Sequence, residues 1–260
     1  MNAENPIGVF DSGVGGISVL AELERELPHE HFIYYGDTLH APYGTKTPEE
    51  VMACVRQVMK ELTAREVKAV VIACNTATSV AAATLRQEMT LPIIGMEPAL
   101  KPASLVRHEG AILVLATPVT LSLPKFQSLM ERYGEGAVPL PCPGLMELVE
   151  QKDFHEAKHY LQQALSAYDL AAVDAIVLGC THYVFLRPLL RELLPDHVQV
   201  MDGNSGTAKQ LRRVLEKGDL LRRDGEGSIH LLSSSPKEED HTCMLELLTL
   251  ARQQSVVSGL

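Results

Sequence analysis

Two stretches of the chain, VKAVVIACNTATS at 67–79 and VDAIVLGCTHYVF at 173–185, share one pattern and decide the fold. Each is an apolar run rich in β-branched residues that ends at a cysteine, Cys74 or Cys180. Nearly continuous apolar runs of this length are typical of strands buried on both faces of a parallel sheet. Their repetition predicts two α/β halves of similar construction.

Further landmarks repeat around the two cysteines. The same number of residues separates Asp11 from Cys74 and Thr117 from Cys180, and Asp11 and Thr117 each follow a predicted strand. Downstream, an acidic residue follows each cysteine at nearly the same distance, Glu97 in one case and Asp202 in the other. This register strengthens the interpretation as an internal repeat.

Strand-like runs alternate with amphipathic helical stretches along the whole chain. Strands are predicted at 7–10, 31–36, 67–73, 91–96, 111–116, 173–179, 197–201 and 228–232, and helices for example at 48–65 and 153–170. This alternation predicts parallel sheets that are covered by helices on both faces. In such sheets the ligand lies beyond the carboxyl ends of the strands, so functional residues should directly follow strands.

The two cysteines suggest a mechanism. If the halves face each other about an approximate twofold axis, their strand-end loops meet in one cleft, with Cys74 on one wall and Cys180 on the other. Thiols on two sides of a bound carbon atom suit proton removal from one face and proton delivery to the other. We therefore expect the active site in the cleft between the two halves.

Each thiol needs help to react, because a free cysteine with a pKa of about 8.5 is only a few per cent thiolate at neutral pH. The start of the helix that should follow each cysteine favours a negative charge. Asp11 is the acidic partner expected beside Cys74, and His182 is the proton acceptor expected beside Cys180. Asp11 could also cap the helix expected near Gly16, which is compatible with catalysis.

The other cysteines carry no such pattern. Cys54 and Cys243 lie within helical stretches, where a cysteine is usually a buried apolar residue. The chain has five cysteines and no CxxC pair, which argues against a disulfide framework and a structural zinc site.

The predicted strand-end loops favour a small carboxylate ligand. DSGVGG at 11–16 completes neither a dinucleotide fingerprint nor a P-loop. Backbone amides and hydroxyl groups at helix starts suit a carboxylate, and an amino acid brings its own ammonium group. Because no metal-ligand spacing or strand-end lysine for pyridoxal phosphate is evident, we predict that no cofactor and no metal takes part. Lysine and arginine are absent from the strand-end segments, which lie at 11–16, 36–44, 74–79, 116–120 and 180–183.

The charge balance argues against two classes of partner. The formal net charge is −10, with 33 acidic and 23 basic residues, so neither nucleic acid nor an anionic membrane surface is an expected partner. No apolar run approaches the roughly 20 residues of a membrane span, and no signal peptide is visible. We expect a cytoplasmic location.

Six segments, in order, resemble signature segments of the aspartate/glutamate racemase family: FDSGVGG, YYGDTLHAPYG, ACNTATS, GMEPA, ATPVT and GCTHY. The pair ACNTA and GCTHY is shared across the family, whereas DSGVGG with PYG points to its glutamate branch. The resemblance covers about residues 7–207. It implies a cofactor-independent, two-base interconversion of L- and D-glutamate that supplies D-glutamate for peptidoglycan, often by a homodimer.

The resemblance also implies two flavodoxin-like domains, with the end of the chain returning to the first. We place the first domain at 1–97 plus 208–260 and the second at 98–207. Cys74 and Cys180 correspond to the acid/base residues, Asp11 and His182 to their helpers, and Glu150 to an acidic residue near the histidine. The run GLMELVE, which ends at Glu150, departs from the more Phe-Val-Pro-like run that precedes this glutamate in the family. The implied substrate contacts are Asp11, Ser12, Tyr43, Gly44, Asn75, Thr76, Thr117, Thr120, Thr181 and His182.

Three alternatives stay open at this point. An aspartate racemase of the same family differs by one methylene of the substrate, which is worth only about 1–3 kcal/mol of discrimination. A decarboxylase of the same architecture would need one thiol, whereas both positions hold cysteine here. A non-catalytic module that binds small acids would explain the helix-start loops but not the two cysteines.

Overall fold

The computed structural model describes the backbone of residues 2–257 and the side chains of residues 2–254. Its contacts divide the chain into two compact units, Met1–Met96 with Asn204–Leu260, and Glu97–Gly203. The boundaries predicted after residues 97 and 207 differ from these, and the second would cut helix α10 (Asn204–Lys217). Among the described residues, no helix has both the length and the hydrophobicity that a membrane span requires.

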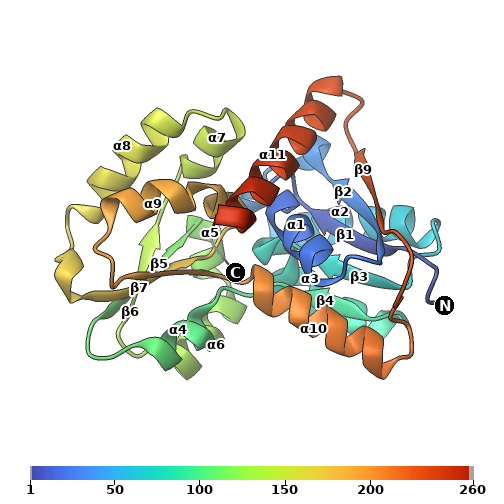
Figure 1. Ribbon diagram of the computed structural model, residues 1–260, viewed down its shortest axis with the longest axis horizontal. Helices are drawn as coiled ribbons and strands as arrows, with labels where there is room; N and C mark the ends of the chain where they lie inside the picture. Colours follow the sequence, from blue (N-terminus) through green and yellow to red (C-terminus); the bar gives the residue numbers. More distant parts are fainter. Residues whose placement is uncertain (1, 258–260) are drawn as a thin grey trace. The chain divides into compact units, whose positions relative to one another are not determined.

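The first unit is built on a parallel sheet whose described strands have the order β4-β3-β1-β2-β9 (Figure 1). Its strands are β1 (Ile7–Asp11), β2 (His31–Gly36), β3 (Ala69–Ile72), β4 (Ile93–Gly95) and β9 (Ser228–Ser233). Its helices are α1 (Ile17–Glu26), η1 (Thr38–His40), η2 (Tyr43–Thr45), α2 (Pro48–Thr63), α3 (Asn75–Glu88), α10 and α11 (Glu238–Val257), where η marks a 3₁₀ helix.

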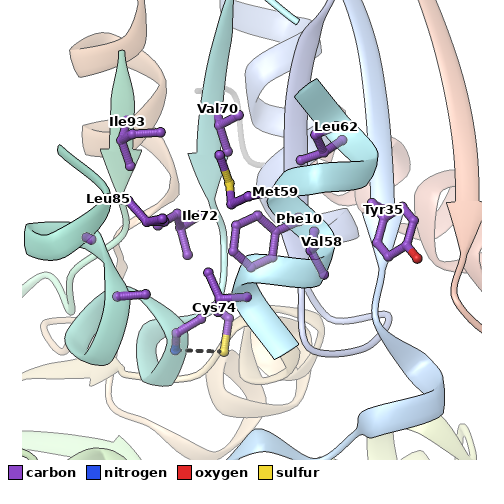
Figure 2. Packing of buried hydrophobic residues seen from close by; sticks show 14 of the residues in the cluster. Phe10, Tyr35, Val58, Met59, Leu62, Val70, Ile72, Cys74, Leu85 and Ile93 are labelled. Atoms are coloured by element: carbon purple, nitrogen blue, oxygen red, sulfur yellow. Dashed lines mark hydrogen bonds between the residues drawn. The ribbon is translucent and has the colours of Figure 1, made fainter. Parts of the chain in front are cut away.

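Helices cover both faces of this sheet, as the continuous apolar strands predict. One face packs on α2 and α3. Figure 2 shows this core, with Phe10, Val70 and Ile72 of the sheet among Val58, Met59, Leu62 and Leu85 of the helices. On the other face, α1 contacts α10 and α11. The predicted start of α2 is confirmed: Thr47 accepts a hydrogen bond from the backbone of Glu50, whose carboxylate accepts one from the backbone of Thr47.

The second unit repeats this plan on a smaller parallel sheet with the described order β6-β5-β7-β8. Its strands are β5 (Ala111–Ala116), β6 (Ala137–Pro141), β7 (Val173–Leu178) and β8 (Gln199–Asp202). Its helices are α4 (Leu100–Val106), α5 (Pro118–Ser122), α6 (Pro124–Tyr133), α7 (Leu145–Glu150), α8 (Phe154–Leu165), η3 (Leu170–Ala172), η4 (Thr181–Leu186) and α9 (Arg187–Leu193). The order β8-β7-β5-β6 corresponds to β4-β3-β1-β2 of the first unit, so the predicted pair of similar α/β sheets is confirmed.

Strand β6 is absent from the sequence-based prediction. Its five residues, AVPLP, include Pro139 and Pro141, which cannot donate backbone hydrogen bonds and argue against a strand. β6 nevertheless pairs with β5, because it lies at the edge of the sheet, where one side of the strand needs no partner. The predicted helix at 153–170 is also too long, since α8 ends at Leu165.

The strand registers correct one detail of the repeat. In the first sheet Phe10 lies opposite Ile72, so Ser12 continues the register opposite Cys74. In the second sheet an irregularity after Ala111 shifts the register by one residue, which places Thr117 opposite Cys180. The structural counterpart of Thr117 is therefore Ser12 rather than Asp11.

Candidate active site

Cys74 lies at the carboxyl end of β3 and is the N-cap residue of α3. Its sulfur accepts a hydrogen bond from the backbone N–H of Ala77 at 3.4 Å (dashed in Figure 2). The thiol can donate to Ser12 Oγ, 3.5 Å away at the end of the neighbouring strand. The N–H groups at a helix start favour a negative charge, so this position stabilises the thiolate form of Cys74.

Asp11 ends β1, the strand that pairs with β3, and is 1% exposed. Its carboxylate accepts a hydrogen bond from the backbone N–H of Gly13 at 2.9 Å, which shapes the turn that leads to α1. Gly16, the N-cap residue of α1, packs so closely on Asp11 that a Cβ atom there would lie 2.6 Å from the Asp11 Cβ. A glycine at 16 is thus required for the buried placement of Asp11.

The other predicted contacts of the first unit lie on its strand-end loops and helix starts. Asn75 and Thr76 form the first turn of α3 and are both buried. Tyr43 and Gly44 lie in η2, which contacts α3. The structure therefore brings Tyr43 and Gly44 to the helix that Cys74 caps.

In the second unit, Cys180 follows β7 at the start of η4 and contacts His182, which in turn contacts Glu150. The Cys180 sulfur lies 3.7 Å from His182 Nδ1, and His182 Nε2 lies 2.9 Å from a carboxylate oxygen of Glu150. His182 is buried, whereas the Glu150 side chain is 36% exposed. Glu150 ends α7, which packs against η4, so the contact holds despite the departure of GLMELVE from the family pattern.

These contacts determine the charge of the imidazole. Burial disfavours the charged form and lowers the pKa of His182, but the hydrogen bonds to Cys180 and Glu150 outweigh burial. The pKa of His182 therefore lies well above its ordinary value. A protonated His182 places a positive charge 3.7 Å from the Cys180 sulfur.

The threonines of the second unit occupy corresponding loops. Thr117 is the N-cap residue of α5, and its hydroxyl lies 2.9 Å from that of Thr120, whose backbone N–H it also accepts at 3.3 Å. Thr181 directly follows Cys180 and is buried. All three side chains therefore lie after strands of the sheet that carries Cys180.

Two residues that sequence reasoning did not single out support the site. Asp37 directly follows β2 and is 2% exposed; it accepts the hydroxyl proton of Tyr43 in a hydrogen bond of 2.6 Å. In the second unit, the backbone carbonyl of Cys142 accepts a hydrogen bond from Tyr183, the residue after His182. A buried aspartate at a strand end was the available signal for Asp37, whereas nothing in the sequence indicated Cys142.

Burial, together with a smaller contribution from the neighbouring Cys180, raises the pKa of Cys142 to about 12. The Cys142 thiol is therefore an inert packing group, unlike the two thiols that have donors around them. All five cysteines lie within the described residues, and none of them forms a disulfide bond there.

Comparisons with known proteins agree with this geometry. The family model for Asp/Glu/hydantoin racemases matches residues 7–211. A glutamate racemase from Bifidobacterium adolescentis is 51% identical over 90% of this chain and 94% of its own, and one from Clostridium perfringens is 46% identical over 83% and 85%. The crystal structure of the glutamate racemase isoform RacE1 from Bacillus anthracis superposes with a TM-score of 0.85 at 29% identity and covers 95% of each chain. The chain belongs to the aspartate/glutamate/hydantoin racemase family.

Proposed function

We propose that the protein interconverts L- and D-glutamate without a cofactor, and that Cys74 and Cys180 are its two acid/base residues. The observation that carries this proposal is the placement of both cysteines at equivalent strand ends of two similar sheets, where Cys74 contacts a helix-start N–H and Cys180 contacts His182. The names of the relatives support glutamate as the substrate. The D-glutamate formed would serve peptidoglycan synthesis.

The proposed reaction balances with these two groups alone. The thiolate of one cysteine takes the α-proton and becomes a thiol, which leaves a carbanion at the α-carbon of glutamate. The thiol of the other cysteine delivers its proton to the opposite face and becomes a thiolate. In the reverse direction the two residues exchange roles, and proton exchange with solvent resets them between turnovers.

We propose that the remaining predicted residues hold the substrate and tune the thiols. Backbone amides and hydroxyls at the helix starts bind the two carboxylates, and Asp11 assists Cys74. His182 assists Cys180 and is itself oriented by Glu150 through the 2.9 Å contact. The implied contact residues are Asp11, Ser12, Tyr43, Gly44, Asn75, Thr76, Thr117, Thr120, Thr181 and His182.

The Glu150 contact leads to a pH-dependent prediction. Replacing Glu150 with glutamine removes a carboxylate that raises the pKa of His182, so that pKa should fall. The positive charge beside Cys180 is lost as the pH rises through the pKa of His182, so activity should decline at a lower pH in Glu150→Gln than in the unmodified enzyme. The pH profile of kcat/KM tests this expectation. If kcat/KM of Glu150→Gln declined at the same alkaline pH as that of the unmodified enzyme, Glu150 would not be a positioning residue for His182.

Cofactor independence is tested by dialysis. We expect full racemisation after exhaustive dialysis against a chelator, and no visible absorption from a bound pyridoxal group, because the proposed steps use only the two thiols. Activity that is lost on dialysis and restored by zinc or pyridoxal phosphate would overturn this part of the proposal.

Substrate choice is tested by comparing turnover of glutamate with that of aspartate, each followed from both enantiomers. Faster turnover of aspartate would favour the alternative within the same family. Binding of either amino acid without inversion would favour a non-catalytic module.

The location and the oligomeric state are further parts of the proposal. Cysteines that form no disulfide suit a reducing, cytoplasmic setting. The family resemblance supports a homodimer, which light scattering of the purified protein tests.

A further inference from the structure

A second cluster of reactive side chains lies in the first unit, beside Tyr43, and includes neither Cys74 nor Cys180. The carboxylate of Asp37, the imidazole of His40 and the thiol of Cys54 offer ligand atoms that all lie within 4.8 Å of one another. Among the described residues, no other group of three histidine, cysteine or acidic side chains meets this condition. We propose that Asp37, His40 and Cys54 bind a single Zn²⁺ ion.

The three ligand atoms lie close enough together for a small rearrangement to place them around one zinc ion. Zinc bonds of about 2.0–2.3 Å hold their ligand atoms about 3.3–3.8 Å apart. His40 Nδ1 now lies 2.8 Å from Asp37 Oδ1, as in a hydrogen bond, so an ion would enter by separating these two atoms. The His40 side chain is 43% exposed and has room to turn, whereas Asp37 and Cys54 are held by the end of β2 and by α2.

The donor set selects the kind of metal. One sulfur, one imidazole nitrogen and one carboxylate oxygen suit zinc, whereas Mg²⁺ and Ca²⁺ take oxygen ligands. A thiolate and a carboxylate would together balance the charge of the ion. His40 and Cys54 are partly exposed, so water can reach the fourth position.

Asp37 links this site to the surroundings of Cys74. Its second oxygen accepts the hydroxyl proton of Tyr43, an arrangement that orients the carboxylate in the way outer-shell partners orient metal ligands. Its backbone N–H donates to the carbonyl of Asp11 at 3.0 Å. A bound ion would therefore restrain the loop that carries Tyr43, although the proposed proton transfers do not need it.

Cobalt binding to the full-length protein tests the site directly. After chelator treatment and dialysis, Co²⁺ should bind at one equivalent and give a near-ultraviolet thiolate-to-cobalt charge-transfer band, which Zn²⁺ should abolish by competition. Cys54→Ser should lose the band, and Cys243→Ser, the control, should keep it. His40→Gln should weaken Zn²⁺ binding by more than the roughly 10–100-fold that loss of an outer-shell partner costs.

The cysteine variants also separate this site from the proposed catalytic thiols. Cys74→Ala and Cys180→Ala should keep the band at unchanged affinity. The proposal is overturned if no stoichiometric band forms, if Cys54→Ser retains it, or if Cys74→Ala or Cys180→Ala loses it. His40→Gln changes a partly exposed side chain and provides a second test should Cys54→Ser fail to fold; zinc affinity equal to that of the unmodified protein would again reject the site.

Discussion

Replacing Cys74 or Cys180 with alanine should each abolish racemisation of glutamate in both directions. In the proposed reaction every turnover uses one thiolate as the base and the other thiol as the acid, so removing either group leaves one proton transfer without its partner. General acid–base groups typically contribute about 10²–10⁴-fold each, and a loss of at least this size is expected from either variant. Initial rates from L- and from D-glutamate, followed by chiral chromatography, measure it.

Cys243→Ser provides the matched control. Cys243 lies on α11, apart from the residues assigned to the reaction, and its loss should leave turnover within a few-fold of the unmodified rate. Because the side chains of Cys74 and Cys180 are small and buried, circular dichroism and the urea unfolding midpoint should show that the alanine variants keep the fold. Normal turnover in either Cys74→Ala or Cys180→Ala would rule out the two-base assignment.

The second large effect concerns stability. Lys68, just before β3, is fully buried and donates to Glu30 at 2.5 Å; the Glu30 side chain is only 1% exposed. The lysine also donates to the backbone carbonyl of Ala3, and Glu30 accepts a hydrogen bond from the backbone N–H of Arg222. Lys68→Met would leave the Glu30 charge buried without its partner, so the free energy of unfolding should fall by about 3–5 kcal/mol. Urea denaturation measures this change.

Two comparison variants separate charge burial from lost packing. Lys68→Met combined with Glu30→Gln removes both charges and should be less destabilised than Lys68→Met alone. Arg56 and Glu88 form an exposed pair at 2.7 Å, and Arg56→Ala should cost less than about 1 kcal/mol. A double variant as unstable as Lys68→Met would show that packing, not the buried charge, dominates.

The sequence predicts the sheets well because their strands are buried on both faces. Runs such as AILVLA at 111–116 are then apolar throughout, and a strand that follows this rule is recognised wherever it occurs. β6 does not have this continuous apolar pattern. It is an edge strand that is only partly buried and tolerates proline at 139 and 141. Its pairing depends on β5, and no local pattern reveals that dependence.

In the site, too, some residues can be predicted from a local sequence pattern and others depend on contacts of the folded chain. Cys74 and Cys180 can be predicted because each directly follows a recognisable strand. The correspondence of Ser12 with Thr117 cannot, since it depends on a one-residue shift between β5 and β7 that leaves no mark in the spacing. Asp37 does follow a predicted strand, but its contacts with Tyr43 and His40 form only in the folded loop.

The central claim is that two different thiols handle the proton on the two faces of one α-carbon. Glutamate of one configuration, incubated in heavy water without added cofactor, tests this most directly when both enantiomers are analysed early in the reaction. The account predicts that the newly formed enantiomer carries deuterium at the α-carbon from its first appearance, because the proton delivered comes from a solvent-exchanged thiol. Product that retains the α-proton of the substrate would contradict it, since a single group would then have removed and returned the same proton.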